Sequence, residues 1–233
     1  MQAIILAGGK GTRLLPYTTV LPKPLMPIGD YPILEIILKQ LKKAGIRTIT
    51  LAVGHLAALL EAYFGDGRKW GIDIRYSKED QPLGTAGPIS LIEDLTDDFI
   101  VMNGDILTTM DYSAFIQYHI SNNCTATIGV FGKEVKIDLG VLKMDKDFTV
   151  EDYVEKPSYY FQVCMGIYVF NPTVTGYIEK GKYLDLPDLI KRLIENNEMV
   201  KGYLFDDYWR DIGTTEDYNL ALDEFDGNKG RLL

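Results

Sequence analysis

A glycine-rich segment near the N-terminus has the composition of a phosphate-binding loop. The segment AGGKGTRLLP, residues 7–16, leaves an apolar run through three glycines and then presents cations. Glycines let backbone amides approach an anion closely, and arginine adds a planar fork of donors. Neither common phosphate motif matches, because Leu14 stands where the dinucleotide motif needs glycine, and Ile4 where the P-loop needs it. A tight glycine turn with a solvated Arg13 is the alternative.

A lysine and two aspartates are the next candidates for chemistry. Lys23 lies between two prolines in LPKPLMP, which restrict the backbone and present its ammonium group at low entropic cost. Asp105 follows the apolar run FIVMN, and Asp211 lies much later, in WRDIG. Two carboxylates from separate segments suit Mg²⁺, which keeps several waters and takes one or two protein carboxylates. A solvated lysine and an ordinary strand-end turn at NGD are the alternatives.

The apolar pattern predicts the scaffold that must position these residues. Four short apolar runs indicate strands at residues 3–7, 48–53, 72–76 and 99–103. Residues 33–45 show helical periodicity and stop at a glycine. This alternation predicts an α/β/α sandwich of Rossmann-like type, with a mostly parallel sheet. Ligands of such sheets bind beyond the carboxyl ends of the strands, where the glycine loop falls.

The second half of the chain is richer in strands. Strand patterns occur at residues 125–131, 139–144, 150–155, 164–170 and 199–205, and helical patterns at 112–122, 186–197 and 214–225. No linker separates the halves and no repeat is present. We therefore expect a single domain over residues 1–233, in which a mixed β lobe extends the same sheet.

Composition excludes some classes of partner. The 233 residues are 46% hydrophobic and carry a formal net charge of -9, which disfavours nucleic acid and anionic membranes. No signal-length or membrane-spanning apolar run is present, so we expect a cytoplasmic protein. Cys124 and Cys164 lack metal or redox spacing, and His55 and His119 suggest no site.

Further motifs accompany the glycine loop in a fixed order: GGKGTRL, LPKPLMP, YFGDG, PLGTAG, NGD, VEKP and WRDIG. Over nearly the whole chain, this set resembles the sugar-1-phosphate nucleotidylyltransferases, or nucleotide-sugar pyrophosphorylases. The resemblance implies Mg²⁺-dependent transfer of a nucleotidyl group from a nucleoside triphosphate to a sugar 1-phosphate, with release of pyrophosphate. Longer members carry a C-terminal left-handed β-helix. This chain resembles the short, catalytic-domain form, such as mannose-1-phosphate or heptose-1-phosphate guanylyltransferases.

The resemblance also implies roles for individual residues. Arg13 and Lys23 are the expected catalytic residues, because the reaction depends on positioning two anions and neutralising their charge. Asp105 and Asp211 are the expected metal ligands. The expected nucleotide-binding residues are Ala7, Gly8, Gly9, Gly11, Thr12, Arg13, Glu79, Gly84 and Thr85.

The sugar phosphate is assigned to a third group of residues by the same resemblance. Lys156 is expected to bind the phosphate and Glu155 the sugar hydroxyls, with Gly140 and Gly166 allowing the backbone to approach the sugar. Many members carry asparagine at the position of Cys164, which cannot bond a hydroxyl comparably. The identity of the sugar therefore stays open.

The base is predicted from SKEDQPLGTAG. In uridylyl- and thymidylyltransferases of this family, a glutamine five residues before the loop glycine recognises the pyrimidine, and here Glu79 holds that position before Gly84. A carboxylate only accepts hydrogen bonds, and guanine offers two adjacent N–H donors, so GTP is favoured. If Gln81 faces the base instead, UTP or dTTP is the substrate.

Two functions of other classes are alternatives. A non-catalytic nucleotide-sugar sensor is expected to lose Arg13, an aspartate ligand or Lys156, and none is lost. A glycosyltransferase usually binds metal through an Asp-x-Asp pair, and Ile106 and Leu107 follow Asp105 instead. Family members commonly form dimers or tetramers, which leaves a homo-oligomer open.

Overall fold

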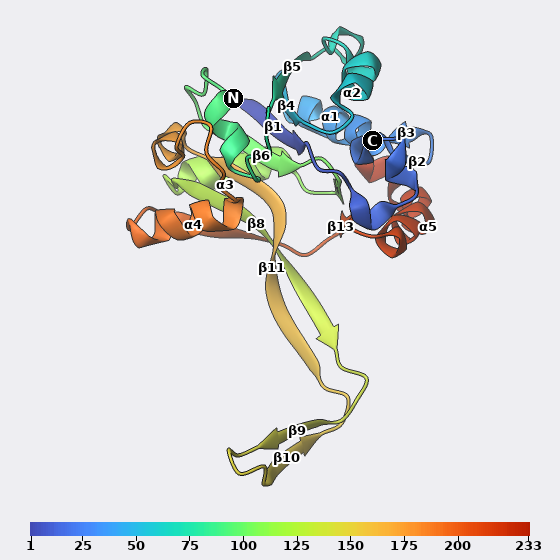
Figure 1. Ribbon diagram of the computed structural model, residues 1–233, viewed down its shortest axis with the longest axis vertical. Coiled ribbons are helices and arrows are strands. Elements are labelled where there is room, and N and C mark those ends of the chain that lie inside the picture. The colour runs from blue at the N-terminus through green and yellow to red at the C-terminus, as the bar shows by residue number, and fades with distance from the viewer.

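One central sheet organises the chain in the computed structural model, which describes residues 1–233 (Figure 1). Its strands are β1 (Gln2–Ala7), β4 (Thr48–Val53), β5 (Asp73–Lys78), β6 (Phe99–Asn103), β8 (Ala126–Lys136), β11 (Ser158–Phe170) and β12 (Val200–Phe205). The order is β12-β8-β11-β6-β1-β4-β5. Only β11 runs against its neighbours, because it pairs antiparallel with β6 and β8 while all other pairs are parallel. The predicted α/β class and mostly parallel sheet are confirmed.

Three two-stranded ladders stand beside this sheet. They pair β2 (Pro27–Ile28) with β3 (Tyr31–Pro32), β7 (Ile106–Thr108) with β13 (Trp209–Asp211), and β9 (Val141–Met144) with β10 (Val150–Val154). The helices are α1 (Ile33–Lys43), α2 (Ala57–Phe64), α3 (Tyr112–Ser121), α4 (Leu186–Glu195) and α5 (Thr215–Leu232). Short 3-10 turns are η1 (Thr12–Leu14), η2 (Tyr17–Thr19), η3 (Lys23–Leu25), η4 (Arg68–Trp70), η5 (Gly87–Leu91) and η6 (Pro172–Tyr177).

Two hydrophobic cores lie on opposite faces of the sheet. Successive side chains of a strand point to opposite faces, and β1 sends Ala3 and Ile5 to one core and Ile4 to the other. The first core is covered by α1, α2, α3 and α5, and the second by α4, η5 and η6. Each fully buried isoleucine contributes roughly 1.5–3 kcal/mol relative to exposure. This double cover explains why the central strands are apolar almost throughout.

Helix ends follow local capping signals. The Asp111 carboxylate accepts hydrogen bonds from Ser113 N at 2.8 Å and Ala114 N at 3.2 Å, which begins α3. Thr214 and Asp217 form a reciprocal capping box at the start of α5. The α5 helix continues to Leu232, beyond the end at residue 225 that the sequence pattern predicts. Its C-terminal part contains two glycines, which local propensity disfavours in a helix. None of these helices combines the length and the apolar composition that a membrane span requires.

A long two-stranded arm leaves the body of the protein (Figure 1). It consists of residues 132–163: the outer halves of β8 and β11, which remain paired, and the β9–β10 hairpin at the far end. The predicted β lobe thus extends the central sheet, as expected, but it projects outward as an arm. The α4 helix and η6 cover only the part of β8 and β11 that lies within the body.

Candidate functional site

A cavity of about 790 Å³ opens at the carboxyl edge of the parallel strands. The residues that follow β1, β4, β5 and β6 all line it, namely Gly8, Gly54, Glu79 and Gly104. The chain runs outward from β1 to β4 and β5 and then returns to place β6 on the other side of β1. Such a reversal of strand order opens a crevice at this edge, where α/β sheets bind ligands.

The glycine loop forms one wall of this large cavity. Gly11 has φ 61°, and a Cβ there would lie 2.8 Å from Thr18 Cγ2, so a side chain would be both strained and crowded. The Thr18 hydroxyl donates to Gly11 O at 2.8 Å and closes the turn. Arg13 follows in η1, lines the cavity, and takes part in no ion pair. Its guanidinium group is therefore available to an anion.

A lysine and two aspartates meet beside this loop. The Lys23 ammonium group is ion-paired with Asp105 Oδ2, and the other oxygen of that carboxylate, Oδ1, is buried without a hydrogen-bond partner. Ile212 N donates to Asp105 O at 3.1 Å, which brings Asp211 next to Asp105. Asp211 is exposed as a residue, but desolvation of its carboxyl group still raises its pKa. Asp105 adds to this rise, whereas Lys23 and Arg13 oppose it. The two carboxylates thus lie close enough to repel each other.

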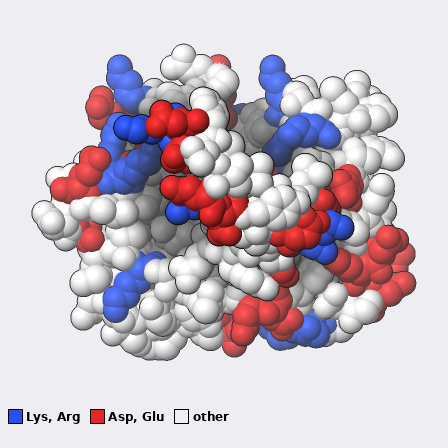
Figure 2. All heavy atoms as spheres, turned by 90° about the horizontal axis from the view of Figure 1, so that it is seen from below, with Lys and Arg blue, Asp and Glu red and all other residues white.

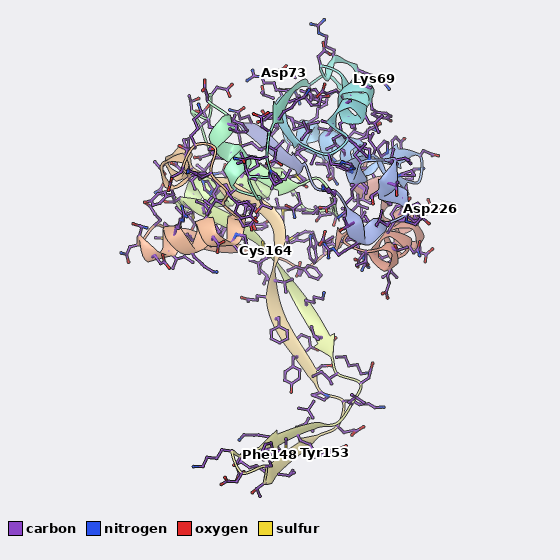
Figure 3. All side chains as sticks on the ribbon, viewed as in Figure 1. Lys69, Asp73, Phe148, Tyr153, Cys164 and Asp226 are labelled. Atoms are coloured by element: carbon purple, nitrogen blue, oxygen red, sulfur yellow. The ribbon has the colours of Figure 1, made fainter.

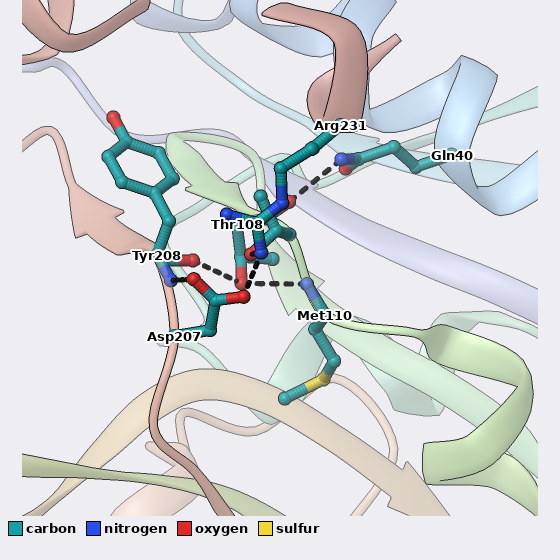
Figure 4. Close-up of polar contacts among 7 residues, drawn as sticks. Gln40, Thr108, Met110, Asp207, Tyr208 and Arg231 are labelled. Carbon is teal, nitrogen blue, oxygen red and sulfur yellow. Dashed lines mark hydrogen bonds and ion pairs between the residues drawn. The ribbon is translucent and has the colours of Figure 1, made fainter. Parts of the chain in front are cut away.

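A hydrogen-bond network fixes the ladder that carries these aspartates. Asp105 immediately precedes β7, and Asp211 pairs with Ile106 at the end of β13. Thr108, fully buried, anchors the other end: its hydroxyl donates to Tyr208 O at 3.0 Å and accepts from Met110 N at 3.2 Å (Figure 4). Gln40 Nε2 of α1 donates to Thr108 O at 2.7 Å, and Arg231 of α5 is ion-paired with Asp207 beside the ladder. The ladder therefore sets the spacing of the two carboxylates, and residues of α1 and α5 hold the ladder in place.

The loop after β5 brings a carboxylate over the glycine loop. Glu79 Oε2 accepts a hydrogen bond from Leu83 N at 2.8 Å, and its Oε1 lies 3.0 Å from where a Cβ on Gly8 would stand. Thr85 N donates to Asp185 Oδ1 at 3.0 Å, which ties the loop to the start of α4. Glu79 is half-buried and Gln81 exposed, and both line the large cavity. The wall of the large cavity therefore includes both Glu79 and Gln81, the two candidates for contact with the base.

A second cavity of about 260 Å³ adjoins the first and shares Thr85 and Asn103 with it. Gly166 lies in its wall with φ 72°, and a Cβ there would lie 2.7 Å from Asn103 Nδ2. The Cys164 thiol donates to the Tyr168 hydroxyl at 3.1 Å, also in this wall. The remaining lining residues are Met165, Leu186, Pro187, Trp209 and Asp211. No lysine or arginine lines this small cavity.

The structure brings together most of the predicted site residues. All nine predicted nucleotide-binding residues line the large cavity, together with Lys23 and Asp105. Asp211 and Gly166 line the small cavity. Gly140, Glu155 and Lys156 line neither, because they lie in the arm, where they are exposed. The Glu155 carboxylate accepts a hydrogen bond from the Tyr153 hydroxyl at 2.8 Å. No group of three or more histidine, cysteine or acidic side chains has the arrangement of a metal centre.

Several cavity residues escaped the sequence analysis. His55 lines the large cavity just beyond β4, where His55 N donates to Gly8 O at 3.4 Å, although its sequence context suggested no site. Its place after the predicted strand 48–53 was the available signal. Asn103 touches both cavities, and Tyr183 reaches the large one while its hydroxyl donates to Asp185 Oδ2 at 2.7 Å. No local signal indicated Tyr183, because its contribution depends on how α4 packs.

Comparison with known proteins agrees with this architecture. A family model described as "Nucleotidyl transferase" matches residues 2–226. The chain is 34% identical to UTP--glucose-1-phosphate uridylyltransferase of Synechocystis and 33% identical to mannose-1-phosphate guanylyltransferase of Mycobacterium tuberculosis, over 95% and 94% of its own length. It spans 62% of the length of each.

A solved structure is similar over almost its entire length. The structure of HddC from Yersinia pseudotuberculosis complexed with GMP-PN shares 28% sequence identity and a TM-score of 0.72, covering 96% of this chain and 99% of that one. The family model covers nearly the whole chain. The chain therefore belongs to the nucleotidyl transferase family.

Proposed function

We propose that this chain transfers a nucleotidyl group from a nucleoside triphosphate, with GTP favoured, to a sugar 1-phosphate, forming a nucleotide sugar and pyrophosphate. The observation that carries the proposal is the convergence of an unpaired arginine, a glycine loop, a lysine and two aspartates at two adjoining cavities. The names of the related guanylyl- and uridylyltransferases support the same reaction.

The triphosphate is proposed to lie along the glycine loop. The backbone amides of Gly8, Gly9 and Gly11 are proposed to donate to its phosphates, and at Gly9 nothing lies within 4 Å of a Cβ position. Arg13 is proposed to hold the β- and γ-phosphates and to offset the charge of the departing pyrophosphate. This assignment explains why a cavity in a protein of net charge -9 retains a free guanidinium group.

The two aspartates are proposed to hold Mg²⁺. Asp105 Oδ1 is buried without a partner, and Asp211 has a carboxyl group whose pKa is raised partly by its acidic neighbour. A buried oxygen without a donor is costly unless a cation satisfies it, and hard oxygen ligands suit Mg²⁺. When bound, the ion supplies positive charge that offsets the repulsion between the two phosphates.

The chemical step is a displacement at the α-phosphorus. An oxygen of the sugar 1-phosphate attacks, a new P–O bond forms, and the bond to pyrophosphate breaks, so no group on the protein becomes covalently modified. Lys23 is proposed to contact the α-phosphate. Its ion pair with Asp105 holds the ammonium group at the cavity wall. The small cavity is proposed to receive the sugar, because it adjoins the large one through Thr85 and Asn103.

Glu79 is proposed to accept hydrogen bonds from the N–H donors of guanine. Its carboxylate is positioned by Leu83 N and faces the loop at Gly8. A second candidate is a uridylyl- or thymidylyltransferase in which Gln81 contacts the base, since that residue also lines the cavity. Measuring pyrophosphate release with GTP, ATP, UTP and dTTP against a panel of sugar 1-phosphates separates them. Preference for GTP supports the proposal, and absence of pyrophosphate with every pair refutes transfer.

A further inference from the structure

The small cavity lacks the charge that its proposed ligand requires. A sugar 1-phosphate carries a phosphate group, and none of the ten residues that line this cavity is a lysine or arginine. The only charged side chain in its wall is Asp211, which repels phosphate. Lys23 lines the large cavity and not the small one, and it is already assigned to the α-phosphate. As a place for a phosphorylated sugar, the cavity of one chain is incomplete.

The arm carries free cations that its own chain does not use. Lys156 lies in no ion pair and is exposed, and its backbone has φ 47°, a left-handed conformation uncommon for a residue with a side chain. The Tyr153 hydroxyl holds the neighbouring Glu155 carboxylate at 2.8 Å. The stretch of β11 from Ser158 to Cys164 spans about 20 Å at roughly 3.3 Å per residue. Lys156 therefore lies far from the small cavity of its own chain.

The arm also exposes an apolar face. In β8 and β11, the paired residues Val135 and Tyr159 lie on the same face as Phe161, and the Tyr159 and Phe161 rings are 6.5 Å apart. In the hairpin, Leu142 pairs with Tyr153 and Met144 with Val150, and these four are 45–60% exposed. The labelled Phe148 and Tyr153 lie at the far end of the arm, and Cys164 where the arm joins the body (Figure 3). Nothing in the chain covers this face.

Charge on the arm argues against a membrane or nucleic acid as its partner. Lysines at 133, 136, 143, 146 and 156 are accompanied by acids at 134, 138, 145, 147, 151, 152 and 155. Seen from below, charges of both signs are interspersed without a continuous basic surface (Figure 2). Anionic surfaces need an excess of cations, and an apolar face with mixed charge suits another protein.

The body offers an apolar surface beside the cavity. Leu15, Tyr17 and Val20 directly follow the glycine loop and are 56%, 49% and 73% exposed. In a two-fold dimer, each contact between two different surfaces is made twice. The arm of each copy can therefore contact the cavity mouth of the other copy.

We propose that two copies of this chain exchange arms, so that the apolar face of one arm packs beside the cavity mouth of the other copy and Lys156 completes its small cavity. The proposed occupant is a second copy, because each chain has a small cavity without a cation and carries a free cation on its arm, away from that cavity. The inference rests on the proposed function for the nature of the ligand. It goes beyond that function in making each site a product of two chains.

The assembly can be tested without any activity. Light scattering should give a dimer for the wild-type chain and a monomer for Leu142→Asp combined with Met144→Asp. The circular dichroism spectrum should stay unchanged, because both side chains are exposed in the single chain. Lys156→Cys should form an oxidised dimer through Cys164 of the partner subunit, and Cys164→Ser should abolish that band. Lys146→Cys, on the same arm, is the matched control and should not cross-link to it. A monomer at all concentrations, or an intramolecular Lys156→Cys disulfide, overturns the proposal.

Complementation tests the shared site directly. Arg13→Ala and Lys156→Ala chains, co-expressed with different tags and purified as the mixed dimer, should recover about half of the wild-type rate, because one of the two sites then has both residues. Each variant alone should be nearly inactive, and Lys146→Ala should be unaffected. If the mixed dimer gains nothing, Lys156 acts within its own chain and the proposal fails. If the wild type releases no pyrophosphate, the proposed function fails instead, and the cross-link still decides the exchange.

Discussion

The ammonium group of Lys23 is ion-paired with the carboxylate of Asp105, and both side chains are largely buried, at 12% and 20% exposure. The other carboxylate oxygen of Asp105 has no partner. Without ligands, Lys23 is therefore the principal neutralising group of a region that also contains Asp211. A cation that binds both aspartates would take over this role and release Lys23 toward substrate.

Replacing Lys23 should make stability depend on divalent cations. Lys23→Met leaves two neighbouring carboxylates without a counterion, and should lower the free energy of unfolding by about 1–3 kcal/mol in the presence of a chelator. Added MgCl₂ should raise the Tm of the variant more than that of the wild type, because binding to the native state alone stabilises it. Differential scanning calorimetry gives both values, and an equal response of the two proteins would contradict the assignment of a cation to these carboxylates.

Asp211→Asn should separate stability from activity. The pKa of Asp211 is raised in the folded state, chiefly by desolvation and then by Asp105, so ionising this carboxyl group at neutral pH costs stability. The free-energy cost of ionising Asp211 grows as pH rises through the folded-state pKa. An asparagine at this position has no charge and therefore removes this cost. We expect an equal or higher Tm at pH 7 with a turnover at least about 100-fold lower. A marked loss of Tm would show that the carboxylate has a structural role instead.

Glu79→Gln should change the preferred nucleotide. An amide matches the donor and acceptor pattern of a pyrimidine, and the pair between a carboxylate and guanine is worth roughly 1–3 kcal/mol, or about one to two decades in kcat/KM. The variant should lose specificity for GTP and gain for UTP or dTTP. Gln81→Ala is the matched control from the same loop and should keep the wild-type ranking. An unchanged ranking in Glu79→Gln together with a changed one in Gln81→Ala would transfer base recognition to Gln81.

His119 should make the fold sensitive to mild acid. It is 1% exposed, its Nδ1 lies 2.8 Å from Thr127 Oγ1, and burial lowers its pKa despite Asp98 nearby. Below the unfolded value of about 6.5, the unfolded chain takes up a proton that the folded chain does not. The contribution of neutral His119 to the free energy of unfolding is therefore fully present above that pH. It is lost as pH falls, by at most about 1.4 kcal/mol per pH unit for one group. In urea titrations between pH 7 and 5, His119→Gln should reduce this dependence, and an unchanged slope would exclude His119 as its source.

Sequence patterns predicted the parts of the fold that depend on local periodicity. Residues 48–53 and 99–103 were predicted as strands, and β4 and β6 have these bounds. The parallel arrangement followed from alternation of strands and helices, which also located the glycine loop at the carboxyl edge. The path of the arm could not be predicted, because whether a strand pair packs on the body or leaves it depends on distant contacts.

The difference between local patterns and distant contacts also explains which residues of the candidate site could be predicted. Arg13, Lys23 and Asp105 lie close to predicted strand ends or stiff turns, so the sequence could place them together. Asp211 joins them through the ladder between β7 and β13, which a tertiary network at Thr108 maintains. Lys156 has equally clear local chemistry, but its position in the arm separates it from the small cavity of its own chain.

Phosphorus NMR of the reaction mixture is the most direct test of nucleotidyl transfer at this cavity. With GTP, MgCl₂ and mannose 1-phosphate or a heptose 1-phosphate, the wild type should produce one pyrophosphate for each GDP-sugar, and Arg13→Ala should slow this by about 100- to 1,000-fold. Lys10→Ala, in the same loop, should have a smaller effect. Formation of GDP and inorganic phosphate, or a full rate in Arg13→Ala, would contradict the account.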